Sequence, residues 1–179
     1  MKLTELDIPG VFLIVPDVFE DKRGFFYESY NKEVFARHGI HTKFVQDNVS
    51  GSAKGTLRGL HYQIAPRAQA KLVRVVKGEA FDVSVDIREG SKTFGRSISV
   101  YLSEENGKML YVPPGFAHGF CALRDRTEFL YKVSEFYSPE HERGIKWNDP
   151  ALKIEWPKLD VEFIVSDRDQ KFPFFKSLF

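Results

Sequence analysis

Three features that would place the chain in a special class are missing from its sequence. Cys121 is the only cysteine among 179 residues, so no disulfide can form within the chain, and the disulfide-rich secreted scaffolds are excluded. No stretch approaches the roughly 18 apolar residues that a membrane-spanning helix needs, and no basic segment followed by an apolar one stands at the N-terminus. We therefore expect a cytoplasmic protein that does not contact a membrane.

An excess of charge of one sign is also missing. The chain carries 26 Lys and Arg against 25 Asp and Glu, a net charge of +1, and it has no dense basic run. General binding to a phosphate backbone requires a concentrated basic surface, so we expect no nucleic-acid partner. A single anionic small ligand, held by a few Arg and Lys, remains compatible with this composition.

Aromatic side chains, in contrast, are abundant. They make up 15% of the residues, and 17 of them are Phe. Such a composition favours a β-rich core and leaves rings for stacking on a flat ligand. The length suits one domain with a sizeable core, and no internal repeat or linker indicates a second one. We expect a single domain over residues 1–179.

Short apolar segments separated by turns predict most of the secondary structure. One short helix is predicted over 31–38, with Asn31 as its cap. Short, evenly spaced strands are typical of a closed β-barrel or sandwich. The predicted strands are 11–15, 25–30, 43–49, 71–76, 79–87, 96–102, 108–112, 116–123 and 127–136.

The segment 79–87 alternates strictly between apolar and polar residues. The apolar members are Phe81, Val83, Val85 and Ile87, and the polar members are Asp82, Ser84 and Asp86. Because successive side chains of a strand point to opposite faces, this pattern predicts one buried face.

Two polar groups within predicted strands leave alternatives open. His61 lies in the stretch 55–63; a lone histidine in a strand is more often a satisfied core residue, but it also titrates nearest neutral pH and suits acid–base work. Gln46, Asp47 and Asn48 follow one another although β-propensity disfavours them. They form either a polar strand end or a set of hydrogen-bonding groups for a polar ligand.

Two segments resemble the paired motifs of the cupins, a family of double-stranded β-helix (jelly-roll) barrels. Gly55 and His61 fit the start of the first motif, and the segment 107–118 fits the second up to His118. A metal-binding cupin has a second histidine where this chain has Gln63, and a Glu where it has Arg67 and Ala68. Two histidines are too few to close a transition-metal site. We expect an all-β, cupin-like barrel with one or two short helices and no metal.

A longer series of motifs resembles the dTDP-4-dehydrorhamnose 3,5-epimerase family over residues 11 to 170. The series is Arg58-Gly-Leu-His61-Tyr-Gln, Lys71-Leu-Val-Arg-Val, Phe81-Asp-Val-Ser-Val-Asp-Ile-Arg, Pro114-Gly-Phe-Ala-His-Gly-Phe, Tyr131-Lys, Tyr137-Ser-Pro-Glu and Gly144-Ile-Lys-Trp-Asn-Asp-Pro. The resemblance implies epimerisation of dTDP-4-dehydro-6-deoxy-D-glucose at C3 and C5 without a cofactor, in dTDP-L-rhamnose biosynthesis.

The resemblance also implies the catalytic residues. His61 would be the base and Asp169 would orient its imidazole, although Asp167 stands two residues away. Lys71 would stabilise the enolate oxygen, and Tyr131 would be the acid, with Tyr137 as a competitor. Without the resemblance, Lys71 reads as a solvated lysine and Tyr131 as a buried structural tyrosine.

For the nucleotide sugar, the resemblance implies three groups of ligands. Guanidinium groups match phosphate oxygens, polar side chains suit the edges of thymine and deoxyribose, and an aromatic ring suits the base. The candidates are Arg23, Arg58 and Arg168 for the diphosphate, where the family usually has Lys in place of Arg168; Glu28, Gln46 and Asn48 for the nucleoside; Phe25 or Tyr27 for stacking; and His118 and Glu142 for the sugar.

Strand alternation puts Arg58 and His61 on opposite faces, and a bulge at Gly59 would reconcile them. Family members are homodimers, so we expect a homodimer. In such a dimer the strand 11–15 would be exchanged between subunits, unless it packs within one chain, and a C-terminal extension from about 137 would pack on the barrel.

Two other hypotheses remain for the function. One is a relative that epimerises a single carbon, or acts on another 4-keto deoxysugar. The other is a non-catalytic, cupin-like binding module. Four polar residues at the positions that match the family, His61, Lys71, Tyr131 and Asp169, argue against the latter.

Overall fold

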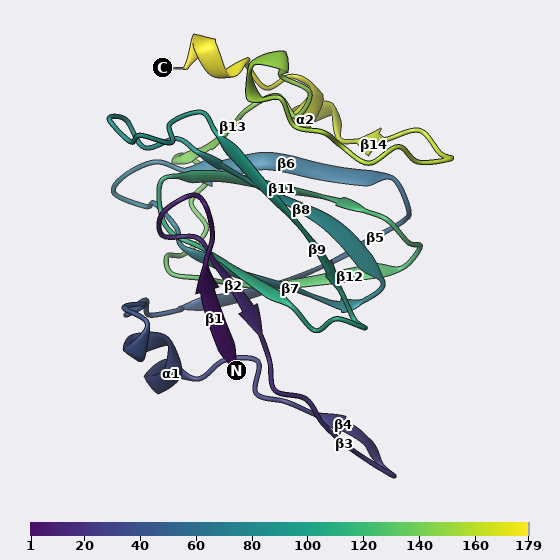
Figure 1. Cartoon of the computed structure of the whole chain (residues 1–179). Coiled ribbons are helices and arrows are strands. Elements are labelled where there is room, and N and C mark those ends of the chain that lie inside the picture. Colours follow the sequence, from purple (N-terminus) through teal and green to yellow (C-terminus); the bar gives the residue numbers. More distant parts are fainter. Residues whose placement is uncertain (179) are drawn as a thin grey trace.

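Two β-sheets that face each other form the body of the molecule (Figure 1). The computed structural model describes residues 1–178. The first sheet contains β1 (Lys2–Glu5), β2 (Phe12–Val15), β5 (Gln46–Ser52), β7 (Lys71–Lys77), β10 (Met109–Val112) and β12 (Thr127–Val133), in the order β1-β2-β10-β7-β12-β5. The second contains β6 (Thr56–Gln63), β8 (Glu79–Asp86), β9 (Ser97–Ser103), β11 (Phe116–Ala122), β13 (Glu142–Gly144) and β14 (Ile164–Val165). Its order is β13-β6-β11-β8-β9, and β14 pairs in parallel with β6. The prediction of an all-β barrel with short helices is confirmed.

Apolar side chains from both sheets fill one part of the space between them. Phe116 and Phe120 come from the second sheet, and Phe129 from the first; the rings of Phe120 and Phe129 stack with centroids 4.1 Å apart. Dense packing of this kind fixes the distance between the sheets. The rest of the interior is lined by polar side chains and forms the cavity described below.

The outer face of the first sheet is covered by the helix α1 (Lys32–Arg37). The side chain of Asn31 accepts hydrogen bonds from the backbone N–H groups of Glu33 and Val34, so the predicted cap is confirmed. Phe35 is buried against Leu72 and Met109 of the sheet. Burial of this one apolar face holds a helix that is too short to be stable alone.

The alternating strand β8 is buried on both faces, so the prediction of one buried face is wrong. Phe81, Val83 and Val85 point outward, into a cluster with residues of the C-terminal segment. Asp82 and Ser84 lie on the opposite face, which points into the barrel. The polar side of this strand therefore faces the interior of the protein and not the solvent.

The C-terminal segment from residue 145 packs over the outer face of the second sheet (Figure 1). Trp156 meets Phe81 with ring centroids 5.9 Å apart. Phe175, in the short 3-10 helix η2 (Phe175–Ser177), meets Phe94 at 5.0 Å. The last residue of the predicted tail, Phe179, lies outside the described residues. The covering explains why a strand with apolar outward residues is stable here.

Near the N-terminus, a hairpin projects from the barrel (Figure 1). It consists of β3 (Phe19–Asp21) and β4 (Gly24–Phe26). Phe25 and Phe26 are each 68% exposed. The apolar strand β2 before the hairpin pairs with β10 of its own chain, and its exchange between subunits stays a prediction. The hairpin therefore presents aromatic rings at the surface of the chain.

Candidate active site

A cavity of about 610 Å³ opens between the two sheets. Its walls combine side chains from strands that are far apart in the sequence. The first sheet contributes Gln46, Asn48, Ser50, Lys71, Phe129 and Tyr131; the second contributes Arg58, His61, Tyr62, Gln63, His118, Phe120 and Glu142; Gln69, Tyr137, Ser166, Arg168 and Asp169 come from connecting segments and from α2 (Asp167–Gln170). Polar groups thus converge on one partly enclosed space, as in ligand sites generally.

A bulge in β6 brings Arg58 and His61 to this cavity together. In the pairing with β11, His61 lies opposite His118, but Arg58 lies opposite Phe120. Three steps on β6 therefore match two steps on β11, which places one extra residue in β6. Gly59 adopts φ +124°, a conformation that side chains disfavour. The predicted bulge is confirmed.

Gly59→Ala is expected to destabilise the protein by about 3 kcal/mol or more, because the new methyl group meets backbone in a left-handed conformation. A Cβ at this position would lie 2.6 Å from Cα of Gly119. Chemical denaturation gives the free energy of unfolding. Gly51→Ala, in β5, is the matched control, since a Cβ there meets nothing within 4 Å. Equal stability of the two variants would contradict a tightly packed bulge.

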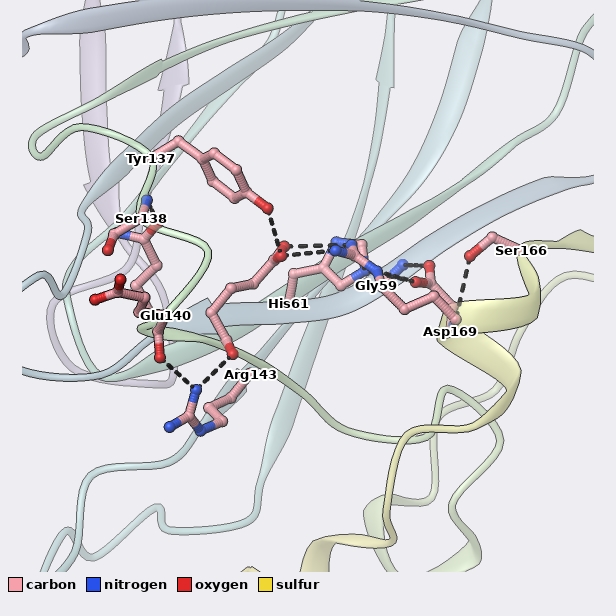
Figure 2. A network of polar contacts seen from close by, with 11 residues as sticks. Gly59, His61, Tyr137, Ser138, Glu140, Arg143, Ser166 and Asp169 are labelled. Atoms are coloured by element: carbon pink, nitrogen blue, oxygen red, sulfur yellow. Dashed lines mark hydrogen bonds and ion pairs between the residues drawn. The ribbon is translucent and has the colours of Figure 1, made fainter.

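The His61 imidazole is held by the carboxylate of Asp169 (Figure 2). The distance from Nε2 to Oδ1 is 2.9 Å, and Oδ2 accepts the backbone N–H of Gly59 at 3.0 Å. Ser166 caps the short helix that carries Asp169. Burial alone would raise the pKa of Asp169, but its hydrogen bonds from His61 and Gly59 lower it to about 2. A carboxylate on Nε2 selects the tautomer with the proton there, so that Nδ1 carries the lone pair of a base.

Lys71, at the start of β7, places an ammonium group inside the barrel. The residue is buried, and Nζ donates a hydrogen bond to the carbonyl oxygen of His61 at 3.2 Å. Burial lowers the pKa of Lys71 to about 8, against the opposing effect of Asp82 and Glu142. The lysine is therefore protonated at neutral pH and lies beside the His61 backbone, not in solvent.

Tyr131 faces the cavity from β12, on the sheet opposite to that of His61. Burial raises the pKa of its phenol, with a smaller opposing effect of Arg58. The competitor, Tyr137, is 52% exposed, and its hydroxyl donates to Glu142 at 2.8 Å. Of the two tyrosines, Tyr131 is the one in the wall of the barrel.

Glu142 and Arg168 form a polar network at the mouth of the cavity. The Arg168 guanidinium donates to both Glu142 oxygens, at 2.6 and 3.2 Å. Its NH2 group also lies 3.4 Å from Nε2 of His61. Because that nitrogen already donates to Asp169, this last contact is a close approach of two donors. The network holds a cation directly beside the imidazole.

Gln63 has a structural role in place of the second cupin histidine. Its amide nitrogen donates to the carbonyl oxygens of Arg67 and Phe136, at 2.6 and 3.2 Å, and its oxygen accepts the N–H of Ser138 at 2.8 Å. All polar atoms of the side chain thus serve the backbone. Within residues 1–178, no group of three or more His, Cys, Asp or Glu is arranged to hold a metal ion.

One buried residue of the site was not predicted from the sequence. Asp82 accepts a hydrogen bond from Nε2 of His118 at 2.8 Å. Burial lowers the pKa of His118, although Asp82 opposes this effect. The signal available in the sequence is the polar side of the alternating strand β8, for which the pattern predicts no burial.

The successive polar residues 46–48 form the start of β5, the edge strand of the first sheet. Gln46 and Asn48 line the cavity and are joined by a hydrogen bond of 2.8 Å. Asp47, between them, points the other way and pairs with Lys132 at 2.9 Å. The succession of polar residues is thus a strand with one face toward the cavity. Whether this face binds a nucleoside stays a prediction.

Four of the predicted ligands, Arg23, Phe25, Tyr27 and Glu28, do not line this cavity, because they lie in or next to the projecting hairpin. Arg23 is exposed and pairs with Asp21 at 2.5 Å. The ring of Phe25 stacks on that of Tyr27, with centroids 5.8 Å apart. Glu28 accepts a hydrogen bond from the side chain of Asn31 at 3.1 Å. The other predicted site residues are brought together.

Known proteins are similar to this chain in both sequence and fold. A model of the dTDP-4-dehydrorhamnose 3,5-epimerase family matches residues 5–177. The dTDP-4-dehydrorhamnose 3,5-epimerase of Pseudomonas aeruginosa is 55% identical over 172 residues, which cover 96% of this chain and 94% of that protein. The match extends over nearly all of both proteins, so the motifs are part of a full-length similarity.

Solved structures give the same result. The 3,5-epimerase from Legionella pneumophila, in complex with dTDP-4-keto-L-rhamnose, has a TM-score of 0.94 at 44% identity, over 98% of this chain and 93% of that one. A 3'-monoepimerase from Streptomyces bikiniensis, in complex with dTDP-quinovose, has a TM-score of 0.89 at 37% identity, over 95% and 86%. Among the described residues, none of the helices has the length and apolar character to cross a membrane. The chain belongs to the dTDP-4-dehydrorhamnose 3,5-epimerase family.

Proposed function

We propose that the chain converts dTDP-4-dehydro-6-deoxy-D-glucose to dTDP-4-dehydro-L-rhamnose, a step of dTDP-L-rhamnose biosynthesis. One observation carries the proposal: His61 and Tyr131 reach a single cavity from opposite sheets, with the Lys71 ammonium between the same walls. Inversion of a carbon next to a ketone requires a base on one face of the sugar, an acid on the other, and a positive charge at the carbonyl oxygen.

The reaction follows from these positions. Nδ1 of His61 takes the proton from the carbon next to the C4 ketone, and the C–H electrons form a C–C double bond while the carbonyl electrons move onto O4. The Lys71 ammonium stabilises this enolate. Tyr131 then donates its proton to the opposite face of the carbon, and the ketone is restored. Exchange with solvent then removes the proton from His61 and returns one to Tyr131, and the same steps at the second carbon complete the inversion of both C3 and C5.

The remaining polar residues suit the rest of the substrate. Arg58 and Arg168 present guanidinium groups that match the diphosphate. Gln46 and Asn48 line the wall of the first sheet, where they suit the edges of thymine or deoxyribose. His118 and Glu142, on the second sheet, are the candidates for the sugar.

We further propose that the active unit is a homodimer in which the β3–β4 hairpin of each subunit completes the cavity of the other. Arg23, Phe25 and Glu28 suit a nucleotide but lie away from their own cavity, and the hairpin exposes aromatic rings. In a dimer with twofold symmetry both cavities receive the same hairpin. The enzyme would act in the cytoplasm, in keeping with a free, buried thiol at Cys121.

Mixing two inactive variants tests the shared cavity. One variant carries His61→Ala, and the other carries Arg23→Ala with Phe25→Ala. After random exchange of subunits, half of the dimers are mixed and each has one intact cavity, so activity is expected to recover to about one quarter of the wild-type value. Turnover of the mixture is compared with that of each variant alone. Hairpins that serve their own subunit would give no recovery.

Solvent deuterium tests the reaction itself. In D₂O, proton abstraction followed by reprotonation replaces each carbon-bound hydrogen by deuterium, so NMR is expected to show label at both C3 and C5. Label at C3 only would assign the chain to the single-carbon epimerases, whose fold is the same. No label at either carbon, with dTDP still bound, would indicate a non-catalytic binding module.

A further inference from the structure

A buried carboxylate beneath the cavity has no part in the reaction described above. Asp82 is 0% exposed in the middle of β8. Its Oδ2 accepts the hydrogen bond from His118, whereas Oδ1 has no hydrogen-bond partner within residues 1–178. An ionised carboxylate in such a place is strongly unfavourable unless a cation compensates it.

A buried cation in the same part of the interior is Lys71: its Nζ bonds to His61, which lies opposite His118, the partner of Asp82. Its ammonium group is also buried, and its hydrogen bond to the carbonyl oxygen of His61 provides no negative charge. Burial is the largest influence on the pKa of Lys71 and lowers it; Asp82 is the larger of the two charges that oppose burial, ahead of Glu142. The carboxylate of Asp82 therefore favours the charged form of Lys71.

The other charged and titratable groups around Lys71 have different partners. These groups are His61 of β6, His118 of β11, Tyr131 of β12, Glu142 of β13, and Arg168 and Asp169 of α2. Glu142 is bound by Arg168 through both oxygens, and Asp169 is bound by His61. Asp82, in contrast, is bound by His118. Burial lowers the pKa of this histidine and so disfavours its cationic form.

We propose that Asp82 is a positioning residue that keeps Lys71 protonated inside the barrel, so that the ammonium is in place when charge develops on the carbonyl oxygen of the substrate. The inference rests on the proposed function, since that function gives Lys71 its role. The same carboxylate fixes the tautomer of His118, with the proton on Nε2. Asp82 acts through these two residues and does not touch the substrate.

The full-length Asp82→Asn variant, labelled with ¹⁵N-lysine, tests this inference. The Nζ signal of Lys71, assigned with Lys71→Met, is followed by NMR as the pH is raised. Loss of the carboxylate is expected to lower the midpoint of the Lys71 titration by about one pH unit or more. The alkaline limb of kcat/KM should move by the same amount, so that activity falls nearly tenfold more at pH 8.5 than at pH 6.

Ser84→Ala is the matched control. Ser84 lies two residues along the same face of β8, and its buried hydroxyl also has no hydrogen-bond partner within residues 1–178. This variant is expected to leave both the Lys71 midpoint and the pH profile unchanged. An Asp82→Asn variant with the wild-type midpoint overturns the inference and reduces Asp82 to packing.

Two further outcomes separate the inference from the function on which it rests. A lowered midpoint with an unchanged alkaline limb supports the pairing of Asp82 with Lys71, but removes Lys71 from the reaction. If Asp82→Asn does not fold, the titration of Lys71 in the wild-type protein tests the inference. A buried lysine without a counter-charge titrates near pH 5–6. A Lys71 ammonium that persists at pH 7 therefore supports the inference, and a neutral amine at pH 7 overturns it.

Discussion

Replacement of His61 by alanine is expected to abolish deuterium exchange at both carbons and to lower kcat by about a thousandfold or more, because general bases contribute roughly 10²–10⁴ to rate. In the proposed reaction His61 is the group on the second sheet that accepts the proton, with Asp169 at its other nitrogen. Tyr131 lies on the opposite wall. The variant therefore has an acid and a stabilising cation but no base.

Exchange is measured by NMR in D₂O, and binding of dTDP by calorimetry. The dissociation constant is expected to change less than about threefold, because no nucleotide contact is assigned to His61. His38→Ala is the matched control: this exposed histidine ends α1 and bonds to the carbonyl oxygen of Val34, so activity should be retained. Normal exchange in His61→Ala would remove the base from the reaction.

A second test uses the space that the substitution opens. Alanine leaves a void in the cavity wall next to Asp169, and exogenous imidazole is small enough to enter a cavity of about 610 Å³. Added imidazole is therefore expected to restore part of the exchange in His61→Ala. The same experiment is repeated with the His61→Ala, Asp169→Asn double variant. Loss of the restoration there would show that the base depends on the Asp169 carboxylate.

The sequence predicts most strands of the second sheet and the bulge in β6 well, because the signals there are local. Alternation of apolar residues predicts the strands, and Gly59 predicts the bulge that turns Arg58 toward His61. The residues alone do not predict whether Asp167 or Asp169 is the partner of His61, and the resemblance to the family favours Asp169. In the structure Ser166 caps the short helix, and Asp169 is its buried residue.

What the sequence does not predict depends on contacts between distant segments. The alternation in β8 predicts that its apolar face lies in the core and its polar face in solvent. In the structure the apolar face points outward and is covered by Trp156 and Phe175, so the polar face points into the barrel. Asp82 is therefore buried, with His118 of another strand as its partner. Likewise, the hairpin residues Arg23 and Phe25 match the family by position, but sequence alone does not say whose cavity they serve.

Replacement of Lys71 by methionine is expected to lower kcat/KM by about 10²–10³, comparable to the loss of one oxyanion-stabilising donor. Methionine keeps a side chain of similar length, and only the ammonium group that we propose to stabilise the O4 charge is removed. Rates at saturating and at low substrate concentration should both fall, since an interaction made in the transition state lowers kcat and kcat/KM together. Lys77→Met, at the exposed end of the same strand, is the control and should retain activity.

The pH profile separates a charge effect from a packing effect at Lys71. With a pKa of about 8, the wild-type lysine is protonated below that pH and neutral above it. Enolate stabilisation is therefore present at pH 7, and kcat/KM should fall about tenfold for each pH unit above 8. In Lys71→Met no ammonium is left to titrate, so this alkaline fall should disappear while the low rate persists. An unchanged alkaline limb in the variant would assign the titration to another group and would leave Lys71 only a structural role.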